Sequence, residues 1–170
     1  MAEEILNRVA QSKLVTFNLE DFYPEGERKV FDLSQWLHEG FVLREAQFRE
    51  EAKAYDWSQY RNTYVALGCS TDAIVPAWAY MLISSYLQPY AKKVVVGSLE
   101  ELESHLYMNI IENLDVSDLA DQPVIVKGCS YKPVPKNAYI FLINKLQPVV
   151  KSLMYGEACS SVPLYKKPKN

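Results

Sequence analysis

The residues of this chain that are best suited to chemistry are its three cysteines, each followed directly by a serine. Two of the pairs belong to a longer motif, Gly68-Cys69-Ser70 and Gly128-Cys129-Ser130, and the third is Cys159-Ser160. Cysteine thiolates bind Zn²⁺ and iron–sulfur clusters, and they also act as nucleophiles. The motif therefore points to thiol chemistry.

The surroundings of the first two cysteines repeat. After each Gly-Cys-Ser, the pairs Val-Pro and Ala-Tyr and the triplet Leu-Gln-Pro recur at nearly fixed spacing: Val75-Pro76, Ala79-Tyr80 and Leu87-Gln88-Pro89, then Val134-Pro135, Ala138-Tyr139 and Leu146-Gln147-Pro148. So many matches indicate a duplicated strand-turn-helix unit, or two turns under the same geometric demand. A reduced third copy, at 159–163, has no helical segment after it.

The elements that position these turns alternate along the chain. Short apolar runs ending in Gly predict buried parallel strands, at 64–68, 93–97 and 123–128. A helical segment follows each run, at 76–90, 98–114 and 135–155, and Ser98 with Glu101 predicts a capping box at the second. This alternation predicts an α/β fold with a mostly parallel sheet and helices packed on it, built around the duplicated strand-turn-helix unit.

The length and composition indicate a single α/β domain over residues 1–170, with one core. Residues 1–60 are expected to supply N-terminal strands, at 14–19 and 29–33, and a helix at 43–55. Residues 61–155 form the alternating strand–helix core, and residues 156–170 form a C-terminal tail.

Charge and hydropathy exclude several classes of partner. The net charge is −3 and the only basic cluster lies at the C-terminus, so nucleic acid is not expected. The longest apolar run is too short to cross a membrane, and the N-terminal residues lack the pattern of a signal peptide. We therefore expect a cytoplasmic protein without a membrane partner, whose cysteines stay reduced. The sequence does not indicate an oligomeric state.

The cysteine turns are expected at a common edge of the sheet. Gly lets the chain turn after a strand, and Pro76 and Pro135 suit the first position of a helix. Cys69 and Cys129 would then lie between strand ends and helix N-termini, where backbone N–H groups favour anions, including thiolate. Cys159 would add a third sulfur if the C-terminal segment folds back.

Three converging thiolates could hold Zn²⁺ or an iron–sulfur cluster. Asp72 and Glu157 are the nearest candidates for a fourth ligand. The hydroxyls of Ser70, Ser130 and Ser160 could support the sulfur atoms or bind an anion, although capping a backbone N–H is the commoner role of such serines. We expect a metal- or iron–sulfur-binding accessory protein.

Two other interpretations stay open. Small buried cysteines also fit tight turns without any chemistry, as in an interaction or scaffold protein. A helix N-terminus could instead activate one cysteine in a thiol-dependent enzyme. Motifs of serine hydrolases, phosphate loops and dinucleotide sites are absent, so no catalytic residue is assigned and an enzyme is less expected than a binding protein.

Several segments resemble an uncharacterised bacterial family, domain of unknown function 2480. They are Asp21-Phe22-Tyr23-Pro24-Glu25-Gly26-Glu27-Arg28, Asp56-Trp57-Ser58-Gln59-Tyr60, the Gly-Cys-Ser turns and Leu146-Gln147-Pro148-Val149-Val150-Lys151-Ser152. The resemblance covers nearly the whole chain and implies no catalytic residue. It does imply an association with iron–sulfur assembly proteins, which are the expected partners.

Overall fold

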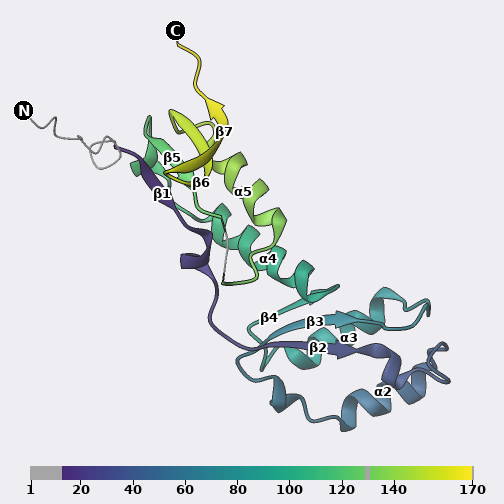
Figure 1. Cartoon of the computed structure of the whole chain (residues 1–170). Helices are drawn as coiled ribbons and strands as arrows, with labels where there is room; N and C mark the ends of the chain where they lie inside the picture. Colours follow the sequence, from purple (N-terminus) through teal and green to yellow (C-terminus); the bar gives the residue numbers. More distant parts are fainter. Residues whose placement is uncertain (1–12, 129–130, 170) are drawn as a thin grey trace, which may run out of the picture. The chain divides into compact units, whose positions relative to one another are not determined.

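The computed structural model describes residues 13–128 and 131–169, which form a mixed α/β structure with two mostly parallel sheets (Figure 1). The chain divides into two compact units. The continuous unit is Pro24–His105, and the split unit comprises the chain up to Tyr23 and from Leu106 onward. Each unit has its own sheet and its own cluster of buried apolar side chains, so two cores stand where the chain length suggested one.

The continuous unit contains a parallel sheet in the order β2-β3-β4 (Figure 1). Its strands are β2 (Arg28–Asp32), β3 (Tyr64–Gly68) and β4 (Lys93–Val96). Its helices are the 3-10 turns η2 (Leu33–Trp36) and η3 (Trp57–Tyr60) and the α-helices α2 (Glu45–Ala54) and α3 (Ala77–Leu87). All three strands run in one direction, so their carboxyl ends meet at one edge of the sheet.

Helical spacing explains how α3 packs. Ala79, Ile83 and Leu87 recur every four residues and are fully buried. They belong to the same cluster of buried residues as Val65 and Leu67, which alternate along β3 and therefore point to one face of the sheet. The burial of these side chains holds α3 on the sheet.

The split unit contains a sheet in the order β1-β5-β6-β7, of which only β7 is antiparallel to its neighbour. The strands are β1 (Val15–Phe17), β5 (Pro123–Val126), β6 (Ser152–Glu157) and β7 (Ser160–Lys166). The helices are η1 (Leu19–Phe22), η4 (Ser117–Leu119) and α5 (Lys136–Leu146). In α5, Ala138, Leu142 and Leu146 form the buried stripe that packs on this sheet.

The remaining helix, α4 (Leu99–Glu112), contains the boundary between the two units. It begins with the predicted capping box: Ser98 N donates to Glu101 Oε2 at 2.6 Å, and Glu101 N donates to Ser98 Oγ at 3.2 Å. None of the helices in the described ranges combines the length and the apolar character needed to span a membrane.

The observed elements follow the predicted ones except near the C-terminus. The helix expected to reach Tyr155 ends at Leu146, because Pro148 has no backbone N–H to donate and its ring would clash with a carbonyl of the preceding turn. Residues 152–157 then form β6. The expected C-terminal tail contains β7, which pairs with β6 in a hairpin.

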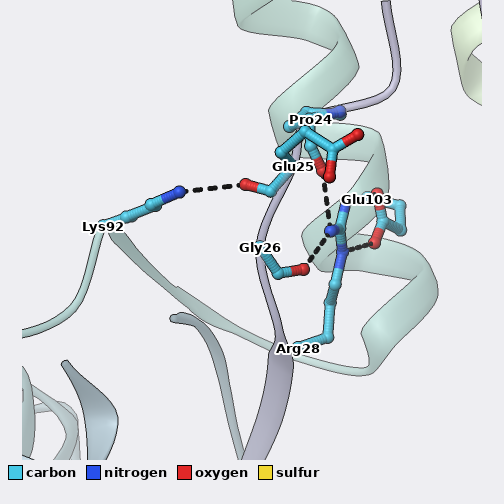
Figure 2. A network of polar contacts seen from close by, with 6 residues as sticks. All are labelled: Pro24, Glu25, Gly26, Arg28, Lys92 and Glu103. Atoms are coloured by element: carbon cyan, nitrogen blue, oxygen red, sulfur yellow. Dashed lines mark hydrogen bonds and ion pairs between the residues drawn. The ribbon is translucent and has the colours of Figure 1, made fainter. Parts of the chain in front are cut away.

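A network of polar contacts around Arg28 connects the beginning of the continuous unit to its end (Figure 2). Arg28 forms an ion pair with Glu103 of α4, with Nε donating to Oε1 at 2.5 Å and Nη2 to Oε2 at 3.2 Å. Its Nη1 donates to the carbonyls of Pro24 and Gly26, at 2.8 and 2.6 Å, and Lys92 Nζ donates to Glu25 O at 2.9 Å. The two ends of the continuous unit are therefore fastened to each other by its own side chains.

We predict that Arg28→Met lowers the free energy of unfolding by about 3–5 kcal/mol. The side chains of Arg28 and Glu103 are only 13% and 7% exposed, so the substitution leaves a carboxylate that is almost fully buried without its cation. Urea unfolding of the full chain measures the loss. The control is Lys167→Met, which removes a solvent-exposed pair with Asp121 and should lower the free energy of unfolding far less than Arg28→Met does. Equal losses of stability for the two variants would contradict the stabilising role of the Arg28–Glu103 ion pair.

Candidate functional site

A pocket lies where the three parallel strands of the continuous unit end. Its volume is about 430 Å³, and residues from all three strand ends, from α3 and from the residue before α4 line it: Val30, Asp32, Leu67, Gly68, Cys69, Ser70, Tyr80, Val96, Gly97 and Ser98. The register places Asp32 beside Gly68, and Leu67 beside Val96. Ligands of open parallel sheets bind at the carboxyl ends of strands, so the position suits a binding site.

Cys69 follows β3 directly and is partly buried in this pocket. Its Sγ lies 3.4 Å from Thr71 Oγ1, and the Thr71 hydroxyl donates to Gly40 O at 2.5 Å. Because Thr71 gives its one hydrogen to Gly40, it can only accept from the Cys69 thiol. The protonated thiol therefore donates a hydrogen bond to Thr71 Oγ1. This hydrogen bond would be lost if the sulfur bound a metal ion or was deprotonated.

Tyr80 of α3 brings a hydroxyl to the same pocket. Burial raises the pKa of this hydroxyl, and the nearby charge of Cys69 raises the pKa further. Tyr80 therefore stays protonated over the physiological range and can donate a hydrogen bond to a ligand or to sulfur.

Asp32, the last residue of β2, organises the strand ends. Its Oδ1 accepts hydrogen bonds from Ser34 N at 2.9 Å and from Ser70 N at 3.0 Å, and the hydroxyls of the two serines lie 3.0 Å apart. Partial burial alone would raise the pKa of Asp32, but the hydrogen bonds from Ser70 and Ser34 lower it to about 2. The carboxylate is therefore ionised at neutral pH.

The helix that follows Cys69 does not start at this pocket. Residues 70–76 separate Cys69 from the first turn of α3. Asp72, Pro76 and Trp78 line a different pocket, of about 600 Å³. The structure thus places the predicted ligands Cys69 and Asp72 in the walls of different pockets.

In the split unit, Cys129 and Ser130 lie outside the described residues. The chain just beyond them is held by Glu20, whose Oε1 accepts from Tyr131 N at 2.8 Å and from Lys132 N at 3.3 Å. Cys159 is exposed in the two-residue turn between β6 and β7, and Glu157 and Ser160 pair across that turn.

The predicted site residues that the structure describes thus fall into separate groups. Cys69 and Ser70 line the strand-end pocket of the continuous unit, whereas Glu157, Cys159 and Ser160 belong to the hairpin of the split unit. Within residues 13–128 and 131–169, no three His, Cys, Asp or Glu side chains are grouped so that they could hold a metal ion. A shared site of three sulfur atoms stays a prediction.

Sequence reasoning missed Asp32 and Thr71 as parts of the site. Asp32 could have been found, because it is a carboxylate at the end of a predicted strand that is parallel to the strand before Cys69. Tyr80 was visible in the repeated Ala-Tyr pair, but only as a repeated residue. No sequence pattern indicates Thr71 as a site residue, because its contact with Gly40 depends on how the loops pack.

Comparison with known proteins gives a family but no activity. The family described as "Protein of unknown function (DUF2480)" matches residues 3–167, which confirms the resemblance seen in the sequence. No curated protein matches the chain. No solved structure matches it either.

We predict that Asp32→Asn lowers the free energy of unfolding at pH 7 by about 1–2 kcal/mol, because a neutral amide accepts the two backbone hydrogen bonds more weakly. The folded pKa of Asp32 lies below its ordinary value of 3.8, so its contribution is complete above that value and is lost as the pH falls towards 2. Urea unfolding at several pH values should show the wild type and the variant converging below pH 4. A difference that stays constant from pH 7 to pH 2 would contradict this role of Asp32.

Proposed function

Because the chain belongs to the DUF2480 family, whose description names no activity, we propose a function from the site itself: the protein binds a thiophilic metal ion or an iron–sulfur species through its Cys-Ser turns, as an accessory of iron–sulfur assembly. The observation that carries the proposal is the position of Cys69 in the pocket at the carboxyl ends of three parallel strands. The thiol thus lies at the edge of the sheet where proteins of this architecture bind their ligands.

The other groups in the pocket support a metal more than a purely structural thiol. Asp32 supplies an ionised carboxylate, and Tyr80 supplies a hydroxyl that can donate a hydrogen bond to sulfur. The described residues offer fewer than three clustered ligands, and a resident Zn²⁺ usually takes four. The missing ligands would come from Cys129, Cys159, Asp72 or Glu157, or from a partner protein, and an incomplete site suits a carrier that passes its metal on.

Reduced cysteines are part of this proposal. Cys69 and Cys159 are both free thiols, which fits a reducing, cytoplasmic setting in a bacterium. Ser70, Ser130 and Ser160 would act beside the sulfur atoms, by hydrogen bonding to them or by shaping the turn.

A reactive thiol is the second candidate, favoured by the shared pocket of Cys69 and the Tyr80 hydroxyl. In that function Tyr80 would donate a hydrogen bond to a substrate bound at the thiol. An inert cysteine in a scaffold protein is the outcome expected if neither metal nor reagent reaches Cys69.

We also propose that the two units are copies of one unit, the continuous copy being inserted in the split copy. The start of each copy supports this: Phe31-Asp32-Leu33 and Phe17-Asn18-Leu19 both end a strand and open a 3-10 turn. Asp32 and Asn18 accept equivalent hydrogen bonds, from Ser34 N at 2.9 Å and from Glu20 N at 3.1 Å. Phe31 pairs with Leu67, the last apolar residue of β3, and Phe17 pairs with Val126, the last apolar residue of β5.

The later part of each copy supports the same relation. Asn62 and Asp121 precede β3 and β5 with φ angles of 60° and 55°, a conformation that Asn and Asp tolerate better than most residues. Their N–H groups donate to Tyr90 O and Val149 O, at 3.0 and 2.9 Å. The buried stripes of α3 and α5 also match: Ala79, Ile83 and Leu87 with Ala138, Leu142 and Leu146. Cys69 and Cys129 would thus occupy corresponding positions of the two copies.

The proposed function predicts that protein purified without oxygen binds Zn²⁺ or iron with sulfide in stoichiometric amounts, and that Cys69→Ser reduces this binding at least tenfold. Metal analysis, sulfide analysis and absorption spectroscopy measure the binding. Cys129→Ser and Cys159→Ser complete the series. One ion per chain that needs several cysteines indicates a shared site, whereas two ions lost one by one indicate a site in each copy.

The control is Ser85→Ala, which replaces an exposed serine of α3 whose hydroxyl donates to Leu82 O and which does not line the Cys69 pocket. It should bind as the wild type does. Absence of bound metal after loading, together with slow labelling of Cys69 in the folded state, would refute both candidates. Fast labelling without metal binding would favour the reactive thiol.

A further inference from the structure

The backbone N–H groups around the Cys69 pocket already hold carboxylates of the chain itself. Asp32 accepts from Ser34 N and Ser70 N, at 2.9 and 3.0 Å. Glu101 accepts from Ser98 N at 2.6 Å, at the start of α4. The sequence predicted that such donors would favour an anion beside the thiol. In the structure these three donors are occupied, so an anionic ligand would have to displace a carboxylate to reach them.

The charge of the pocket points the same way. Asp32 is the only ionisable carboxylate, and the only charged side chain, among the described residues that line it. The other walls are glycine, serine, tyrosine, the thiol and the apolar side chains of Val30, Leu67 and Val96. An anion in the pocket would be repelled by Asp32, whereas a cation would be attracted.

Building on the proposed function, we propose that the Cys69 pocket admits a cation next to the thiol and rejects anions. Its ligand is then a metal ion that arrives with a net positive charge, and not an iron–sulfur cluster carried as an anionic thiolate complex. Asp32 selects the charge, and Cys69 binds the ion.

The charge preference can be measured with two reagents that have the same reactive group and carry head groups of opposite charge. Trimethylammonioethyl methanethiosulfonate is positive and sulfonatoethyl methanethiosulfonate is negative. With either reagent the Cys69 thiolate attacks the sulfenyl sulfur, forms a mixed disulfide and releases methanesulfinate, so no other oxidant is needed. The full chain carrying Cys129→Ser and Cys159→Ser confines the reaction to Cys69. The ratio of the two rate constants in the folded chain is divided by the same ratio in urea, which removes the intrinsic reactivity of the reagents.

We expect a normalised ratio of about ten in favour of the positive reagent, since one nearby charge attracts one reagent and repels the other. Asp32→Asn should lower the ratio at least about threefold, and the Glu101 carboxylate, which lies against Gly97 and Ser98 of the pocket wall, accounts for the preference that remains. The matched control is Glu50→Gln, which removes an exposed carboxylate of α2 that does not line the pocket. That variant should change the ratio less than about twofold, since the charge is exposed to solvent screening.

A normalised ratio of one or below in the unaltered pocket would overturn the proposal. Salt provides a test that needs no folded Asp32 variant: about 1 M sodium chloride should lower the ratio, and a ratio that is independent of salt would also overturn it. The outcome is separable from that of the proposed function. A charge preference without metal binding would refute the metal function alone, and metal binding without a charge preference would refute this inference alone.

Discussion

The carboxylate of Asp32 joins the end of β2 to the turn after β3, and the candidate site depends on this junction. By accepting from Ser34 N and Ser70 N, one oxygen atom fixes the start of η2 and the residue that follows Cys69. The thiol is thereby held in the wall of the pocket. The same carboxylate gives the pocket its charge. The Asp32 carboxylate is thus the main physical cause of both the position of the thiol and the proposed preference of the pocket for cations.

The pocket is a consequence of the parallel sheet. Strands that run in one direction bring Asp32, Gly68 and Val96 to the same edge, although long segments of chain separate them. The fully buried stripe of α3 sets the helix on the sheet, and Tyr80, beside Ala79 of that stripe, reaches the pocket as a result. In the split unit, β1, β5 and β6 create an edge of the same kind, with Asn18 following β1 where Asp32 ends β2.

The sequence predicts the elements of this fold better than their assembly. Glycine after short apolar runs located β3, β4 and β5, and Ser98 with Glu101 located the start of α4, because these signals are local. The division into two sheets depends on which strands pair, and β1 pairs with β5 across more than a hundred residues. Likewise Cys69 could be placed after a strand, but the seven residues before α3 and the contact of Thr71 with Gly40 depend on tertiary packing.

X-ray absorption spectroscopy of the zinc-loaded full chain tests the central claim most directly, because it reports which atoms bind the metal. If Cys69 is a ligand, the spectrum contains a Zn–S distance of about 2.3 Å, and Cys69→Ser removes one sulfur from the coordination shell. A spectrum with only nitrogen and oxygen ligands, or one that Cys69→Ser leaves unchanged, would contradict a metal site at the strand-end pocket.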